Sequence, residues 1–325
     1  MTTTVAPAAA VIRVEPHQAE ALWADIGRVI DNRDLETLTP DEFVDLALAA
    51  SPYLPAEVRS SVTRFRRYAP DGDVVLVRGL LPRDVTFPPT AAAPWAPTTG
   101  TAQAASLLLT SVTVMLGEPF NYASLYEGRI VQSMVPVRGM EHTQTSQSSV
   151  GMLDWHCEDS FREDRCDYAG LLCLRGDPAG ASQYAQARDA SLTPEQWATL
   201  REPRYHVRPD PAHKLAGEVA LRRIALISGP EEAPEIAYDT HHLQPADGED
   251  REAADALEAL GRALDSVAIT HVMEPGDLLI FDNKRVVHAR TPFAARFDGT
   301  DRWLMRTMIC GSTVTFRRWG TRVPE

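Results

Sequence analysis

The chain has 325 residues, of which 44% are hydrophobic and only 7% aromatic, and its formal net charge is −13. This length can bury a sizeable core, in one large domain or two modest ones. An acidic chain with no basic run argues against nucleic-acid binding, because the phosphate backbone favours a basic protein face.

The N-terminal residues contain neither the basic segment nor the long apolar core of a secretory signal. No stretch approaches about 20 apolar residues, so we expect no membrane span. The four cysteines form no CxxC pair and are too few for a disulfide framework, which argues against a structural zinc site. We therefore expect a cytoplasmic protein whose partner is a small molecule.

The first third of the chain is mostly helical in pattern, after about a dozen residues that we expect to be frayed. Thr39 is a suitable N-cap, and Pro40 follows it at the first helical position. A cluster of β-branched residues before a glycine predicts one strand at 73–80. The predicted helices cover 18–30, 40–50, 56–67 and 102–116.

From Arg129 onward, short β segments alternate with turn residues, which is typical of a sandwich or barrel and not of a parallel βαβ sheet. These segments include RIVQSMVPV (129–137), YAGLLCLR (168–175), RIALISG (223–229) and VVHAR (286–290). Two helical insertions interrupt them, at 193–201 and 248–264. The pattern predicts a mostly β protein with α-helices, built as a double-stranded β-helix, or jelly roll. We expect a single catalytic domain over 1–325, with a helical N-terminal part (1–118) and a jelly-roll core (about 119–318).

Three potential metal ligands stand out. The segment LDWHCEDSF places His156 and Glu158 two residues apart, and on a strand such residues point to the same face. His288, in VVHAR, lies on another predicted strand. Two histidines and one carboxylate on neighbouring strands form the facial triad of non-haem Fe(II) oxygenases, which leaves three coordination positions open. An isolated H-x-E is common by chance, so the triad needs independent support.

Two arginines supply that support. Arg302 lies fourteen residues after His288, and Arg306 follows on the same face of the next predicted strand. A bidentate guanidinium suits the carboxylate of a co-substrate. Cations on an otherwise apolar strand are costly unless each meets an anion.

The blocks VPVRGMEHTQTSQSS, LDWHCEDSFREDRCDYAGLLCLRGDP and GDLLIFDNKRVVHARTPFAARFDGTDRWLMR closely resemble the clavaminate-synthase-like 2-oxoglutarate oxygenases. Arginine and asparagine hydroxylases are the nearest members of that family. The similarity is dense between residues 128 and 306 and sparse in the N-terminal helices. It implies a jelly roll that uses Fe(II), 2-oxoglutarate and O₂.

The resemblance also implies roles for individual residues. Arg302 would pair with the distal carboxylate of 2-oxoglutarate. Arg306, with Ser146 nearby, would hold the substrate α-carboxylate, and Glu158 would serve both as iron ligand and as neighbour of the substrate α-amine.

The chain departs from the arginine hydroxylase pattern at three positions. A D-x-D that clamps guanidinium becomes Y-D-T-H-H, which keeps Asp239 but has His241 in place of the second acid. Leu125 aligns with a glutamine that steadies the substrate amine. Ser182 stands where the family has a threonine near 2-oxoglutarate. Asp239 and His241 could also simply cap a loop, since short polar side chains are frequent in turns.

We therefore expect hydroxylation, at Cβ or Cγ, of a free polar or basic L-amino acid such as arginine, citrulline or lysine, in natural-product biosynthesis. Residues 208–247 combine proline, glycine and charge, and are the predicted lid. Desaturation or oxidative cyclisation by the same iron chemistry is the main alternative. A His₂Glu zinc hydrolase would not explain Arg302, and a non-catalytic binding protein would not need an intact triad.

Overall fold

The larger sheet forms the centre of the molecule. The computed structural model describes residues 9–217 and 219–325. Seven strands make up this sheet, in the order β1-β2-β13-β6-β15-β3, with β4 also paired to β15. They are β1 (Ala10–Arg13), β2 (Val74–Arg78), β13 (Leu278–Asp282), β6 (Tyr168–Arg175), β15 (Trp303–Cys310), β3 (Glu118–Phe120) and β4 (Gln132–Met134).

A second, four-stranded sheet has the order β12-β7-β14-β5. Its strands are β12 (Ile269–His271), β7 (Ser182–Gln186), β14 (Val286–Arg290) and β5 (Leu153–His156). Two short antiparallel pairs complete the β structure: β9 (Ile227–Ser228) with β10 (Glu235–Ile236), and β8 (Tyr205–Val207) with β11 (Leu243–Pro245).

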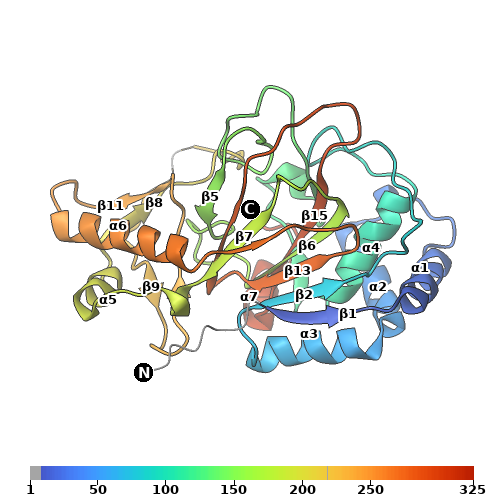
Figure 1. Cartoon of the computed structure of the whole chain (residues 1–325), viewed down its shortest axis with the longest axis horizontal. Coiled ribbons are helices and arrows are strands. Elements are labelled where there is room, and N and C mark those ends of the chain that lie inside the picture. The colour runs from blue at the N-terminus through green and yellow to red at the C-terminus, as the bar shows by residue number, and fades with distance from the viewer. Residues whose placement is uncertain (1–8, 218) are drawn as a thin grey trace.

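The helices lie in two groups at opposite ends of the molecule (Figure 1). One group contains α1 (Pro16–Ile30), α2 (Pro40–Ala50), α3 (Ala56–Tyr68) and α4 (Thr101–Thr113), and the other contains α5 (Pro194–Leu200) and α6 (Arg251–Ser266). Helix α7 (Thr313–Trp319) follows β15. Helix α2 begins as its sequence predicts, because Thr39 and Glu42 form a reciprocal capping box ahead of Pro40.

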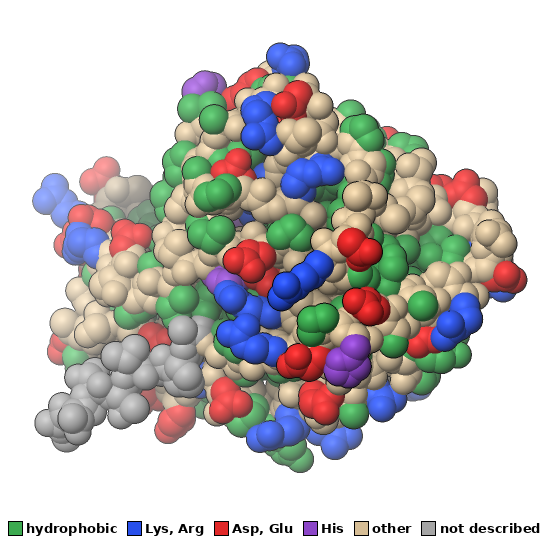
Figure 2. All heavy atoms as spheres, turned by 45° about the vertical axis from the view of Figure 1, so that its right-hand side comes forward, with side chains coloured by type: hydrophobic (Ala, Val, Ile, Leu, Met, Phe, Trp, Pro, Cys, Tyr) green, Lys and Arg blue, Asp and Glu red, His purple; other side chains and the backbone are tan. Residues whose placement is uncertain are grey.

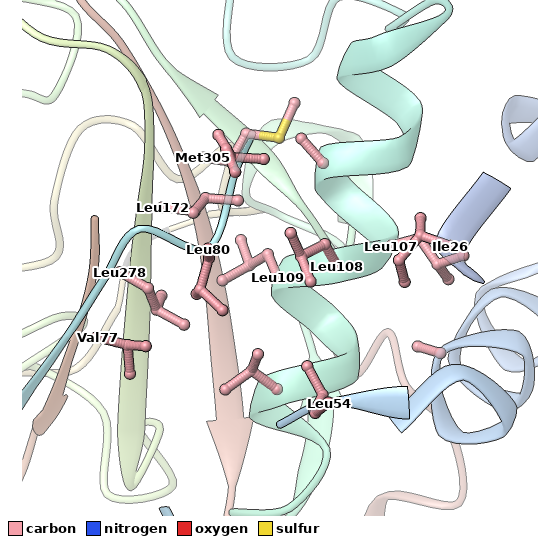
Figure 3. Close-up of a cluster of buried hydrophobic side chains, with 14 of the residues drawn as sticks. Ile26, Leu54, Val77, Leu80, Leu107, Leu108, Leu109, Leu172, Leu278 and Met305 are labelled. Atoms are coloured by element: carbon pink, nitrogen blue, oxygen red, sulfur yellow. The ribbon is translucent and has the colours of Figure 1, made fainter. Parts of the chain in front are cut away.

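Helix α4 is buried along almost its whole length and joins the helical group to the large sheet. Figure 3 shows Leu108 and Leu109 of α4 close to Leu172 of β6 and Leu278 of β13. These side chains are fully buried, and burial of each such side chain stabilises the fold by roughly 1.5–3 kcal/mol. The outer face of the large sheet is therefore anchored by α4.

The inner face of the large sheet packs against the small sheet. Side chains alternate along β15, so Met305 packs toward α4 while Leu304 and Met308 join a second apolar cluster with Tyr184 of β7 and Val286 of β14. Arg306, two residues from both Leu304 and Met308, shares that inner face. The alternation thus directs this arginine between the two sheets.

Most predicted elements are present, with shifted ends. The predicted helix at 40–50 and the strand segments YAGLLCLR and VVHAR have the predicted bounds. Other β segments are shorter than predicted: 129–137 contains only β4, and 223–229 only β9. The expectation of a frayed start was wrong for β1, which pairs in parallel with β2, and residues 1–8 lie outside the described residues.

One face of the surface is drawn in Figure 2, where acidic and basic side chains are interspersed and hydrophobic side chains occur in small groups between them. No helix among the described residues has both the length and the hydropathy needed to cross a membrane.

Candidate active site

One cleft, with walls from both sheets, is lined by every residue that the sequence predicted for the site. His156 ends β5 and His288 lies in the middle of β14, and the two are directly opposite one another in the antiparallel pair. Opposed residues of such a pair project from the same face of the sheet. Their ring centroids are consequently 4.1 Å apart.

Glu158 reaches the same point from a turn. The prediction that it lies on a strand with His156 was wrong, because β5 ends at His156. Asn283 holds the turn: its side-chain oxygen accepts from the Glu158 backbone N–H at 2.8 Å, and its amide donates to the Glu158 carbonyl at 3.0 Å. Asp159 then takes a φ of 53°, a left-handed conformation that reverses the chain.

These three side chains fit a metal ion. One ligand atom from each of His156, Glu158 and His288 lies within 4.8 Å of the others. Nδ1 of His156 is 2.8 Å from the Asp154 carbonyl, to which it can donate, leaving Nε2 free as a ligand. Glu158 Oε1 is 3.3 Å from Nε2 of His288. Two imidazoles and one carboxylate are the donor set that suits non-haem Fe(II).

The protonation states also suit a metal. Burial raises the pKa of Glu158, but Arg306 and both histidines lower it by more, so the net pKa lies well below its usual range. Burial and the neighbouring His156 lower the pKa of His288 to about 4. At neutral pH the carboxylate is therefore ionised and this imidazole neutral, as metal coordination requires.

Arg302 is a buried cation without a counter-ion. Its Nε donates to the Gly180 carbonyl at 2.9 Å and its Nη2 to Ser182 Oγ at 3.3 Å. Within the described part of the chain no carboxylate forms an ion pair with it, and burial lowers its pKa to about 10. Such a charge is costly unless an anion joins it. A Cβ at Gly180 would lie 2.9 Å from the Arg302 Cδ, so glycine leaves room for this side chain.

Arg306 is mostly occupied by protein groups. Its Nε donates to Gln132 at 2.9 Å and its Nη1 to Glu158 Oε2 at 2.5 Å, while Nη2 is buried and unpartnered among the described residues. Ser146 Oγ lies 3.2 Å from the hydroxyl of Tyr126, which is also on the cleft wall. One arm of Arg306 is thus free for a ligand carboxylate.

Both carboxylate oxygens of Asp239 are bonded to groups of its own loop. Its Oδ1 accepts from the backbone N–H groups of His241 and His242, both at 3.0 Å, and its Oδ2 lies 3.0 Å from the His242 ring. The His241 ring lies 2.6 Å from Asp154 and is exposed. The structure therefore shows the loop-capping arrangement at Asp239. Leu125 is 3% exposed and contributes an apolar patch of wall.

Four charged residues on the cleft wall were not predicted from the sequence: Asp154, Asp159, Asp210 and Arg290. Arg290 is buried, and its guanidinium donates to Ser148 Oγ at 2.8 Å. It lies two residues after His288, so strand alternation could have found it. Asp210 lies in an irregular segment, where no periodicity indicates the direction of a side chain.

The family model described as "Taurine catabolism dioxygenase TauD, TfdA family" matches residues 100–308. Enduracididine beta-hydroxylase of Streptomyces hygroscopicus is 32% identical over 303 residues, covering 86% of this chain and 88% of that relative. L-asparagine oxygenase of Streptomyces coelicolor is 35% identical, covering 82% and 80% of the two chains. The structure also resembles the non-haem iron oxygenase OrfP in complex with Fe, succinate and (3S)-hydroxy-L-Arg, with a TM-score of 0.87, 28% identity, and 97% and 99% of the chains covered.

Proposed function

Because the chain belongs to the TauD, TfdA dioxygenase family, we propose that His156, Glu158 and His288 hold the iron of an amino-acid hydroxylase. The protein is an Fe(II)/2-oxoglutarate-dependent oxygenase, and its substrate under this proposal is a free polar or basic L-amino acid hydroxylated at Cβ or Cγ. The observation that carries the proposal is Arg302, a buried cation that has no counter-ion among the described residues and lies in the same cleft as the triad.

Arg302 and Ser182 would bind the distal carboxylate of 2-oxoglutarate. The guanidinium and the hydroxyl are already oriented by Gly180 and by each other, so little ordering is left for binding. When bound, iron with 2-oxoglutarate and O₂ supplies the oxidising chemistry, in which one oxygen atom enters the substrate C–H bond and the other enters succinate as CO₂ is lost.

The α-carboxylate of the substrate would bind Nη2 of Arg306, with Ser146 as a second donor. Glu158 lies beside that position, so its carboxylate can accept a hydrogen bond from the α-amine. These contacts fix the Cα end of the substrate. The β and γ carbons would then point toward the metal centre, which is the reason we propose them as the oxidised positions.

The far end of the substrate determines its class. Asp210 has one carboxylate oxygen bonded to the Ala212 N–H at 2.7 Å, which leaves the other oxygen for a ligand. Asp154 lines the cleft beside His241, whereas Asp239 is filled by its own loop. Acidic walls with open acceptors favour a side chain that donates hydrogen bonds, such as that of arginine, citrulline or lysine. A role in natural-product biosynthesis accords with the enduracididine hydroxylase among the relatives.

We further infer that the two sheets constitute a double-stranded β-helix within one catalytic domain over 1–325. Their shared apolar cluster supports this inference, as does the pairing of β2 with β13, which joins the helical part (1–118) to the core (119–318). The four buried, free cysteines accord with a reducing compartment such as the cytoplasm.

The test is mass spectrometry of enzyme loaded anaerobically with Fe(II) and then given 2-oxoglutarate, O₂ and a panel of free amino acids. Gain of one oxygen on a basic or polar amino acid, with one succinate formed per product, is the expected result. Loss of two hydrogens would instead indicate desaturation or ring closure. No change in any free amino acid would overturn the proposed substrate class.

A further inference from the structure

An irregular segment, 208–217, follows β8 and reaches the wall of the cleft at Asp210. Within 208–217, all of which the structure describes, the one buried residue is His213, whose side chain is fully buried. Loops attached by so few buried groups open and close at low cost in free energy. The position of Asp210 therefore depends strongly on this histidine.

Both ring nitrogens of His213 have partners. Nε2 lies 2.7 Å from Asp159 Oδ1, and Nδ1 lies 2.8 Å from Ser124 Oγ. A carboxylate only accepts, so Nε2 carries the hydrogen, and the serine hydroxyl can donate to Nδ1. The backbone of the segment is attached at the same place, since the Lys214 N–H donates to the Ser124 carbonyl at 2.8 Å.

The ring also packs between aromatic side chains. Its centroid lies 5.1 Å from that of Phe161 and 5.8 Å from that of Tyr122. Serine, histidine and aspartate in a row resemble a hydrolytic triad, but the imidazole here is wholly covered and accessible to no substrate. The three residues therefore act as an attachment.

Asp159 connects this attachment to the metal centre. It directly follows Glu158 in the turn held by Asn283, and it has a positive φ of 53°. Its second carboxylate oxygen is buried, without a partner among the described residues, and Asp159 itself lines the cleft. A hydrogen bond to one oxygen of Asp159 therefore restrains the turn that positions Glu158.

We propose that His213 is a positioning residue that couples the substrate-covering segment 208–217 to the turn carrying Glu158. When the segment is in place, His213 holds Asp210 on the cleft wall and Asp159 in its left-handed conformation. Substrate contact and metal-centre geometry are thereby set together. This inference rests on the proposed function, because it presumes an amino acid bound beside Glu158.

The test compares His213→Ala with His206→Ala as a matched control. His206 also attaches to an irregular segment, through the Arg222 carbonyl at 2.7 Å from its Nδ1, but it is not on the cleft wall. For His213→Ala we expect KM for the amino acid and the ratio of succinate to hydroxylated product each to rise about tenfold. The affinity of the iron-loaded enzyme for 2-oxoglutarate, titrated by its charge-transfer band, should change much less than this KM, because Arg302 and Ser182 are untouched. His206→Ala should behave as wild type.

Limited trypsinolysis gives a readout that is independent of turnover. Substrate should protect Lys214 in the wild type, whereas His213→Ala should be cleaved there with or without substrate. Ser124→Ala removes only the Nδ1 contact, so it should change the coupling ratio and the cleavage at Lys214 in the same direction by a smaller factor. This variant replaces His213→Ala in the test if His213→Ala fails to fold.

Wild-type coupling and protection in a folded His213→Ala or Ser124→Ala would overturn the inference, as would equal uncoupling by His206→Ala. A wild-type enzyme that hydroxylates no amino acid would overturn the proposed function instead, so the two failures are distinguishable.

Discussion

The two halves of the cleft are built differently. The half that contains Arg302, Arg306 and His288 is supported by interior strands of the two sheets: His288 and Arg306 lie on β14 and β15, and Arg302 directly precedes β15. The half that contains Asp210 and Asp239 consists of loops, anchored by a few buried side chains such as His213. Under the proposed function, the residues that bind 2-oxoglutarate and the substrate α-carboxylate lie on or beside strands. Those that contact the substrate side chain lie on loops, which can change without disturbing the sheets.

The largest expected effect is on the strand-borne half. His156→Ala and His288→Ala should each abolish turnover and greatly weaken iron binding, because three protein ligands leave no spare. Iron content after anaerobic loading and succinate formation measure this directly. A variant that kept stoichiometric iron and near-wild-type activity would remove that histidine from the ligand set.

Arg302→Gln should weaken 2-oxoglutarate binding and leave iron binding unchanged. Loss of one buried charge partner should cost about 2–5 kcal/mol in 2-oxoglutarate binding, much of it from the carboxylate left unpaired. Anaerobic titration of 2-oxoglutarate against its charge-transfer band is the measurement. Arg175→Gln is the control, since Arg175 lies outside the cleft wall. An unchanged titration would transfer the role to Arg306 or Arg290.

The same division explains what could be predicted from the sequence. Two-residue periodicity placed His288 and Arg306 on strands correctly, because strand alternation is a local property of the chain. It was wrong for Arg302, because β15 begins one residue later, at Trp303. It misplaced Glu158, since the end of β5 depends on Asn283, which is 125 residues away in the chain. Local patterns carry no information about such a partner.

Loop residues were harder still. Asp239 was a reasonable candidate for substrate contact by resemblance, yet its acceptor capacity is used within its own loop. Asp210 and His213 have no periodic signal around them, and only the folded chain brings His213 to Leu125 and Asp159. The chemistry was therefore more predictable than the substrate.

The two aspartates on the loop half of the cleft should differ in function, Asp210 in substrate binding and Asp239 in stability. Asp210→Asn should cost about 1–3 kcal/mol in kcat/KM for a basic amino acid, because a donor loses its charged acceptor. Uncoupled decarboxylation of 2-oxoglutarate should survive. Asp239→Asn should lower the melting temperature more than it changes the preference between lysine and glutamine. The opposite pattern, in which Asp239 decides that preference, would return the substrate contact to the position predicted from the resemblance.

The smallest expected effect is on stability and concerns Asp282, a buried aspartate next to Asn283. Burial, with the nearby Asp73 and Asp167, raises the pKa of Asp282 to about 7. An unfolded aspartate has a pKa of about 3.9, so between about pH 4 and 7 the folded state binds the extra proton and stability falls as pH rises.

The Asp282→Asn variant can keep an acceptor for the Lys284 N–H, and it does not lose stability in this way because asparagine does not ionise. Urea unfolding should therefore show the free energy of unfolding of the wild type falling by about 1 kcal/mol relative to Asp282→Asn between about pH 6.3 and 8. Exposed Asp255→Asn should follow the wild type at both pH values. Parallel profiles for the wild type and Asp282→Asn would show that Asp282 is ionised in the folded protein throughout this range.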